Sequence, residues 1–231
     1  MTTLRPRLLG GSTRASPGSG GYMHAELSEA IRRARTEVLQ ADSGHLELTF
    51  RDQIWAAMGP YEMAPGNRAV RCPGLIRRTR LCVLCVQRVL PIFSSVRQAA
   101  NETLVRLDDE PGALMEFVQE YLEGRYSWDE AWSRSMSFVT MLQHDYELMA
   151  DHVRAALVLH ASGAALGTAL KDMGEYGGAT LDRDLDAWDA DAYACWAEVG
   201  VEPWKPSGAV QRRTFWIWYL DNAVPAAFES A

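Results

Sequence analysis

The sequence of 231 residues lacks a long uninterrupted apolar run, and this absence sets the first limit on its class. Its most apolar stretch, residues 155–170, contains His160 and is shorter than the roughly 20 residues that a membrane-spanning helix needs. The first 22 residues are rich in Gly, Ser, Arg and Pro, with no apolar run of signal-peptide length. We therefore expect a soluble, cytoplasmic protein with no membrane partner.

The chain also has few metal-binding side chains, with four cysteines and five histidines. Cys82 and Cys85 form a C-x-x-C motif, but a zinc site would need two more ligands at suitable spacing. His144, His152 and His160 are eight residues apart, so their rings would fan out around a helix rather than converge. We expect buried structural cysteines and no metal site, with zinc binding and redox chemistry at the C-x-x-C motif as weaker alternatives.

Catalytic motifs are missing as well. The sequence contains no glycine-rich phosphate loop, nucleophile elbow or serine–lysine motif. The segment DRDLD, residues 182–186, is similar to the start of a calcium loop, but Ala187 and Tyr193 stand where that loop needs glycine and glutamate. These absences predict a protein with no catalytic residues, no cofactor and no enzymatic activity.

Charge is unevenly distributed along the chain, whose net charge is −7. Residues 1–106 carry 15 arginines against eight acidic residues, whereas residues 107–231 carry eight basic residues against 22 acidic ones. Either the two halves neutralise each other within one fold, or the acidic half presents a surface to a basic partner. For the second interpretation, the candidate partner-binding residues are the clustered acids Asp182, Asp184, Asp186, Asp189 and Asp191.

The basic half suggests nucleic-acid binding as an alternative. Residues 63–101 contain seven arginines and no acidic residue. The candidate phosphate contacts are Arg68, Arg71, Arg77, Arg78 and Arg80. A pI near 5.3 and the lack of a recognisable helix-turn-helix oppose this alternative, and the same arginines could pair with acidic helices. Nucleic acid is therefore not the expected partner.

Helical periodicity dominates the chain and predicts an all-α class. We expect a single bundle-like domain of about seven to nine helices over residues 23–231, preceded by a disordered extension over residues 1–22, with Met23 as an alternative start to Met1. Pro91 should break or kink the helix before it. Ser127 and Glu130 form a capping-box pattern. The predicted helices span residues 24–41, 46–58, 75–90, 92–106, 108–124, 127–143, 145–173, 185–200 and 212–225.

The closing segment, RRTFWIWYLDNAVP, concentrates aromatic side chains shortly before a proline. Its signature residues are Arg212, Arg213, Phe215, Trp216, Trp218 and Tyr219. A helix that is apolar around most of its circumference is buried on several sides. Two interpretations stay open, a last core helix or a partner-binding face. Arg212 and Arg213 lie one turn before Trp216, where a guanidinium could stack on the indole.

Four segments, taken together and in order, carry a family resemblance: LCVLCVQRVLPIF, RAALVLHASGAALGTAL, DAWDADAYACWAEVG and RRTFWIWYLDNAVPAA. Over roughly residues 24–228 the chain resembles the Imm-five family of immunity proteins, which are found beside polymorphic toxins in bacterial genomes. The closing segment is the most specific part of the resemblance. The resemblance implies an all-α protein that binds and neutralises a cognate toxin domain, and it supplies no catalytic or toxin-contact residues.

The expected function is therefore that of an immunity protein without catalytic activity. Two other classes stay open. One is an Arg-rich helical nucleic-acid-binding regulator, which a salt-dependent mobility shift would reveal. The other is a helical enzyme with an unrecognised site, which a buried polar pocket would favour.

Overall fold

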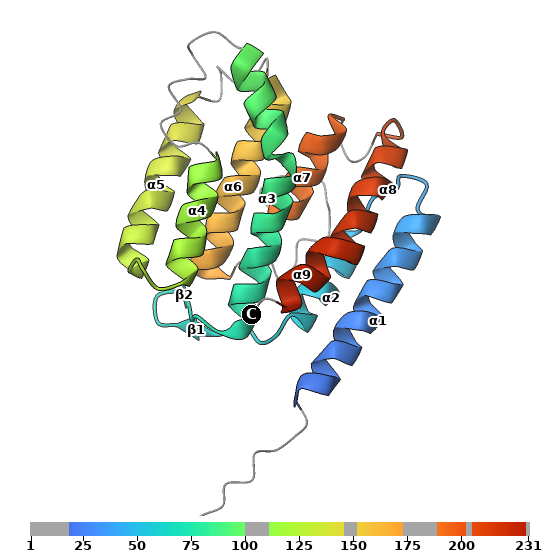
Figure 1. The fold of residues 1–231 in the computed structure, drawn as a ribbon, viewed down its shortest axis with the longest axis horizontal. Helices are drawn as coiled ribbons and strands as arrows, with labels where there is room; N and C mark the ends of the chain where they lie inside the picture. Colours follow the sequence, from blue (N-terminus) through green and yellow to red (C-terminus); the bar gives the residue numbers. More distant parts are fainter. Residues whose placement is uncertain (1–18, 100–110, 146–151, 173–188, 202–204, 230–231) are drawn as a thin grey trace, which may run out of the picture.

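The protein is built almost entirely of α-helices in the parts of the chain that the computed structural model describes (Figure 1). These parts are residues 19–99, 111–145, 152–172, 189–201 and 205–229. The helices are α1 (Ser19–Gln40), α2 (Leu48–Ala57), α3 (Pro73–Ala99), α4 (Pro111–Leu122), α5 (Trp128–Asp145), α6 (Val153–Lys171), α7 (Ala190–Val199), α8 (Ala209–Trp218) and α9 (Val224–Glu229). This confirms the predicted all-α class.

The start of α1 differs from the predicted domain boundary. The helix begins at Ser19 and therefore includes residues that the sequence assigned to the N-terminal extension. Residues 1–18 lie outside the described part of the chain, so the extension stays a prediction there.

Helices α3 and α6 form the centre of the molecule. Helix α3 packs against α4, α6, α7 and α9, and α6 packs against α3, α4, α5 and α7 (Figure 1). One continuous cluster of buried apolar side chains joins these elements, and it includes Val86 of α3 and Leu166 of α6. Burial of such side chains contributes about 1.5–3 kcal/mol each, so the two central helices are held mainly by their packing.

Helix α6 is long and apolar enough to cross a membrane, which corrects the expectation that this segment is too short. It is the one helix of that kind among the described residues. Most of the helix is buried inside the bundle, where residues such as Leu159 and Leu166 contact other helices. Its position in the core accounts for its apolar composition, because a helix buried among other helices can be as long and as apolar as a membrane-spanning helix.

Pro91 lies inside α3 and does not end it, so the predicted separate helix over residues 92–106 is wrong where the structure describes it. A proline in a helix removes one hydrogen bond and crowds the preceding turn. Val89 and Phe93, on either side of Pro91, are both buried in the core. Packing of these flanking side chains holds the chain helical through the proline.

The predicted helix over residues 145–173 is not continuous, because His152 has a non-helical backbone and α6 begins at Val153. Residues 146–151 of that prediction lie outside the described residues. Helix α6 ends at Asp172, which has the left-handed φ of 49°. The backbone N–H of Asp172 donates to the Thr168 carbonyl, and its buried carboxylate pairs with Arg78. The ion pair with Arg78 of α3 therefore holds Asp172 in a left-handed backbone conformation that is uncommon for residues other than glycine.

The capping box at the start of α5 is confirmed. The backbone N–H of Ser127 donates to Oε2 of Glu130 at 2.7 Å, and the backbone N–H of Glu130 donates to Oγ of Ser127 at 3.3 Å. The Ser127 hydroxyl, which donates to Oε2 of Glu130 at 2.7 Å, and then the Ser127 backbone N–H lower the pKa of the Glu130 carboxyl, because both stabilise its charged form. Local chemistry alone defines this helix start.

The segment between the predicted helices 46–58 and 75–90 contains a small antiparallel hairpin. Strands β1 (Met63–Ala64) and β2 (Arg68–Ala69) are two residues long each. Gly66 and Asn67 take positive φ angles of 83° and 56° between them, which is the geometry of a tight hairpin turn. The hairpin joins α2 to α3 and does not change the helical class.

The closing segment remains helical beyond Pro225, where the predicted helix over residues 212–225 ends. After α8, the π turn η4 (Tyr219–Ala223) leads directly into α9, and Pro225 is the second residue of α9. A π turn has a wider hydrogen-bond register than an α-helix. The proline ring, which cannot donate a backbone hydrogen bond, is accommodated where the register has already changed.

Ion pairs join the basic first half of the chain to its acidic second half. The pairs are Arg51–Asp191 at 3.0 Å, Arg78–Asp172 at 2.5 Å, Arg88–Glu198 at 2.5 Å, Arg68–Asp129 at 3.2 Å and Arg35–Asp221. The first two pairs are buried and the third is partly buried. At these positions, arginines of the first half of the chain neutralise acidic residues of the second half within the fold.

Candidate functional site

The aromatic closing segment is part of the core. Phe215, Trp216 and Tyr219 are completely buried. The indole N–H of Trp216 donates to Nδ1 of His45 at 3.3 Å, and the indole N–H of Trp55 donates to the hydroxyl of Tyr219 at 3.2 Å. Since the polar atoms of these rings have partners inside the molecule, this part of the segment is a structural element and not a partner-binding face.

Arg212 and Arg213 do not stack on Trp216, so that prediction is wrong. Their guanidinium groups donate instead to backbone carbonyls at the ends of neighbouring segments. Arg212 donates to Ser43 at 2.8 Å, to Lys205 at 2.5 Å and to Ser207 at 3.2 Å. Arg213 donates to Val38 at 3.1 Å and to Ala41 at 2.8 Å, at the end of α1. The two arginines tie α8 to α1 and to the loop before α8.

The guanidinium groups that do lie over the aromatic rings come from elsewhere in the chain. Arg51 of α2 lies 5.6 Å from the centre of the Trp216 ring, and Arg88 of α3 lies 4.3 Å from the centre of the Trp218 ring. Trp218 is only partly buried.

The acidic cluster divides into two parts. Asp182, Asp184 and Asp186 lie outside the described residues. Asp189 and Asp191, at the start of α7, are buried, and Asp191 pairs with the buried Arg51 of α2. The structure thus corrects the assignment of Asp191 as a partner contact, because a carboxylate held inside the core does not reach a partner surface.

The arginines proposed for nucleic-acid binding do not form one phosphate-binding surface. Arg78 is buried, pairs with Asp172 and donates to the carbonyls of Gly59 and Pro60. Arg77 donates to the Met58 carbonyl and lies 4.0 Å from the centre of the Phe228 ring. These groups are already occupied within the fold, which weakens the nucleic-acid alternative.

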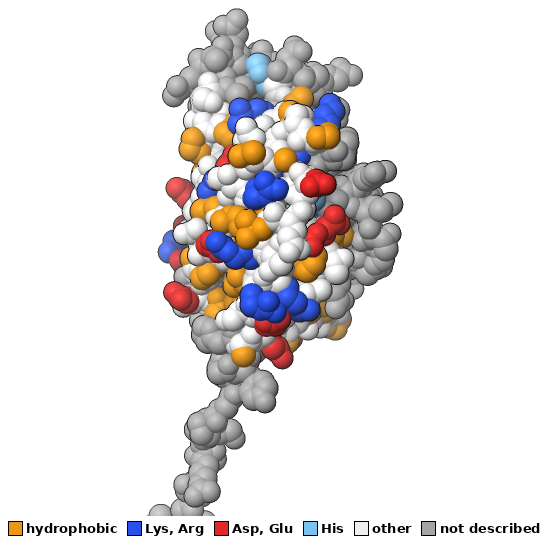
Figure 2. Space-filling view, turned by 90° about the vertical axis from the view of Figure 1, so that its right-hand side faces the viewer, with side chains coloured by type: hydrophobic (Ala, Val, Ile, Leu, Met, Phe, Trp, Pro, Cys, Tyr) orange, Lys and Arg blue, Asp and Glu red, His pale blue; other side chains and the backbone are white. Residues whose placement is uncertain are grey.

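The face formed by α1 and α8 carries acidic, basic and apolar side chains interspersed (Figure 2). A surface that binds nucleic acid concentrates basic groups on one side. This face shows no such concentration among the described residues.

The cysteines match the structural prediction. All four are free and buried. Burial raises the pKa of the Cys82, Cys85 and Cys195 thiols well above the ordinary value, so the reactive thiolate is disfavoured at neutral pH. Within the described ranges, no group of three metal-binding side chains comes together.

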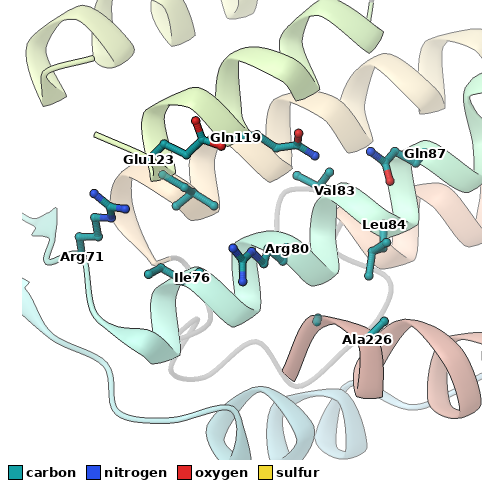
Figure 3. Close-up of a pocket in the computed structure, with 11 residues that line it drawn as sticks. Arg71, Ile76, Arg80, Val83, Leu84, Gln87, Gln119, Glu123 and Ala226 are labelled. Carbon is teal, nitrogen blue, oxygen red and sulfur yellow. The ribbon is translucent and has the colours of Figure 1, made fainter. Parts of the chain in front are cut away.

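A pocket of about 360 Å³ lies between α3, α4 and α9 (Figure 3). Ile76, Arg80, Val83, Leu84 and Gln87 contribute from α3, Gln119 and Leu122 from α4, Ala226 and Ala227 from α9, and Arg71 and Glu123 from the adjoining segments. The α3 residues recur every three or four positions and therefore share one helix face. The sequence identified Arg71 and Arg80 as candidate contacts but missed both glutamines. The spacing along α3 is a signal for Gln87, whereas Gln119 comes from α4.

The pocket has an excess of positive charge. Arg71 and Arg80 have no ion-pair partner among the described residues, and Nη1 of Arg80 is a buried atom with no hydrogen-bond acceptor. The acidic residue of the pocket lining, Glu123, lies 2.7 Å from Nη2 of Arg125, which also pairs with Glu120. Arg78, two positions away on the same helix, has partners for all three of its guanidinium nitrogens instead.

The lining groups can bind an anion but offer little for catalysis. Guanidinium and amide N–H groups donate hydrogen bonds to carboxylate or phosphate oxygens. The lining contains no Ser, Cys, His or Lys side chain to serve as a nucleophile or a proton carrier. The polar pocket that the enzyme alternative requires is present, but its chemistry favours binding.

The fold and the pocket define a helical protein whose candidate site is built for binding. The sequence model of immunity protein Imm5 matches residues 31–226 of this chain. The chain therefore belongs to the Imm5 family of immunity proteins, which confirms the resemblance of its motifs to the Imm-five family. No curated protein matches it.

Proposed function

We propose that the protein binds a cognate toxin protein and neutralises it, with no catalytic activity of its own. The observation that carries this proposal is membership of the Imm5 family over residues 31–226. An immunity protein acts by holding a toxin in an inactive complex, so it needs a stable scaffold and an accessible binding surface. The buried ion pairs and the anion-binding pocket of the helical fold are consistent with both requirements.

We also propose that the partner is a polymorphic-toxin domain and that the protein acts in the bacterial cytoplasm. A producing cell meets its own toxin there, before export. Arg71 and Arg80 of the pocket, which have no ion-pair partner among the described residues, are compatible with contact to an acidic group of another protein.

The experiment is co-expression with the reading frame next to the gene in the bacterial genome. The neighbour alone should kill or arrest the host, and co-expression of the full chain should restore growth and yield a complex that co-purifies. An unfolded variant of the chain is the control for expression load. A neighbour that is harmless, or that kills equally in the presence of this protein, would refute the proposed function.

The enzyme alternative has one observation in its favour, which is the polar pocket between α3, α4 and α9. The ratio of protein to toxin that is needed for protection distinguishes this alternative from the binding proposal. A binding protein protects only when it is present in at least equal amount to the toxin, whereas a catalyst protects at a small fraction of that amount. Titration of the purified toxin with the purified protein measures this ratio directly.

A further inference from the structure

The pocket between α3, α4 and α9 contains a donor without an acceptor. Nη1 of Arg80 is shielded from solvent, and none of the described residues offers it a hydrogen-bond acceptor. A buried polar group without a partner costs about 1–3 kcal/mol, and more when it is charged. Such a group therefore indicates a missing ligand more strongly than an exposed arginine does.

The surroundings of Arg80 reinforce the charge of this donor. Arg71 lines the same pocket and has no ion-pair partner among the described residues, so two arginines face a single acidic residue, Glu123, in the lining. Gln87 and Gln119 place two side-chain amides on the α3 and α4 walls (Figure 3). Two cations and two amide donors around one cavity match an anion that carries two acceptor oxygens.

The size and the walls of the pocket restrict that anion further. The volume of about 360 Å³ lies at the low end of the range for ligand sites. Ile76, Val83 and Leu84 form an apolar wall that suits the methylene groups of a short side chain.

From this geometry, and resting on the proposed function, we propose that the pocket receives an Asp or Glu side chain of the toxin. Arg80 binds its carboxylate inside the pocket and Arg71 binds it at the entrance. An arginine that gains its partner only in the complex contributes to affinity without stabilising the free protein. It also makes the contact selective, since a neutral toxin side chain would leave the charge of Arg80 without a counter-charge.

The decisive variant is Arg80→Gln, which keeps an amide donor and removes the charge. Its affinity for the toxin of the neighbouring reading frame, measured by calorimetry, should fall by roughly 30-fold or more. The thermal unfolding midpoint of the free variant should stay the same or rise, because Arg80 has no partner in the free protein. Arg32→Gln, on the exposed surface of α1, is the matched control and should bind within about twofold of the wild type.

A double-mutant cycle identifies the toxin residue. Each toxin Asp or Glu is changed to its amide, and the carboxylate in the pocket is the one whose loss adds nothing to the loss from Arg80→Gln. An intact wild-type complex that Arg80→Gln leaves unweakened would overturn the pocket assignment while the immunity function stands. A wild-type protein that neither binds nor protects would instead refute the function itself.

A free anion is the remaining competitor for the pocket, and it is tested without the toxin. Acetate and inorganic phosphate are each titrated into the wild type and into Arg80→Gln while the unfolding midpoint is followed. Stabilisation by phosphate alone, lost in Arg80→Gln and combined with unchanged toxin affinity, would assign the pocket to a free anion and overturn the proposal. Weak stabilisation by acetate with loss of toxin affinity supports it.

Discussion

At the scale of single residues, the arginines differ in function according to the acceptors around them. Arg78 donates hydrogen bonds to two carboxylate oxygens and three backbone carbonyls, and Arg212 donates to three backbone carbonyls. The Nη1 atom of Arg80 has no acceptor among the described residues. The guanidinium group is always charged and offers five N–H donors in a fixed fork. The same side chain is therefore a structural clamp where acceptors converge and a binding group where they are absent.

The buried pair of Arg78 and Asp172 should be the most sensitive ion pair to single substitution. Arg78→Met leaves the Asp172 carboxylate buried and unpaired, and we expect the free energy of unfolding to fall by about 3–5 kcal/mol. Arg68→Met removes an exposed arginine that pairs with Asp129, and it should cost about 1 kcal/mol or less. Urea denaturation of both variants measures the difference, and equal losses would contradict the burial argument.

His160 should make stability fall in mild acid. It stacks on Tyr193 with ring centres 5.2 Å apart, and burial lowers the pKa of His160 below its ordinary value of 6.5. Between the folded and unfolded pKa values the unfolded chain binds more protons, so the free energy of unfolding decreases as pH falls below 6.5.

The measurement is denaturant unfolding of the wild type and of His160→Phe, which keeps a stacked ring, between about pH 7.5 and pH 5. The wild type should lose more stability than His160→Phe over this range. Parallel curves would show that His160 titrates alike in the folded and unfolded chains.

At the scale of elements, packing overrides several local signals. Pro91 and Pro225 both lie inside helices, and the first is held by buried neighbours while the second follows a π turn. The local rule that proline ends a helix reflects a penalty of about 3 kcal/mol, which burial of a few apolar side chains exceeds. The helix boundaries therefore follow the core as much as the sequence pattern.

The turn between α1 and α2 depends on Gly44 for both conformation and space. Gly44 has a φ of 65°, and a Cβ atom there would lie 2.2 Å from the Ala209 carbonyl oxygen at the start of α8. We expect Gly44→Ala to lower the free energy of unfolding by at least about 3 kcal/mol, because left-handed strain adds to a clash with backbone. Chemical denaturation measures the loss.

Gly66 provides a matched control for this prediction. It has a φ of 83°, but a Cβ atom there would meet no atom within 4 Å. Gly66→Ala should therefore show the strain alone, about 1–2 kcal/mol. Equal losses in the two variants would mean that contact with α8 does not matter.

At the scale of the whole molecule, the basic and acidic halves of the chain meet across the bundle. Arg51 and Asp191 are 140 positions apart in sequence, and Arg35 and Asp221 are 186 apart. These contacts neutralise part of the opposite charges of the two halves inside the molecule. The net charge of −7 nevertheless remains on the folded protein, so long-range attraction to a basic partner is still expected.

The acids at 182–186 offer a test of that attraction. Replacing Asp182, Asp184 and Asp186 together by Asn should slow association with the toxin at low salt and have little effect at high salt, since steering is screened by ions. Stopped-flow mixing at two ionic strengths measures the rates. Unchanged association at low salt would remove this segment from the binding surface and leave the Arg80 pocket as the candidate contact.

The sequence by itself determined the helical class, the capping box at Ser127 and the burial of Cys82 and Cys85, because these depend on spacing and on contacts within a few residues. Only the tertiary structure decided which arginine meets which acid, and why Arg212 binds carbonyls rather than an indole. It alone brought α3, α4 and α9 around one pocket. The physical reason is that partners for a charged side chain are set by packing between segments far apart in the chain, which no local pattern records.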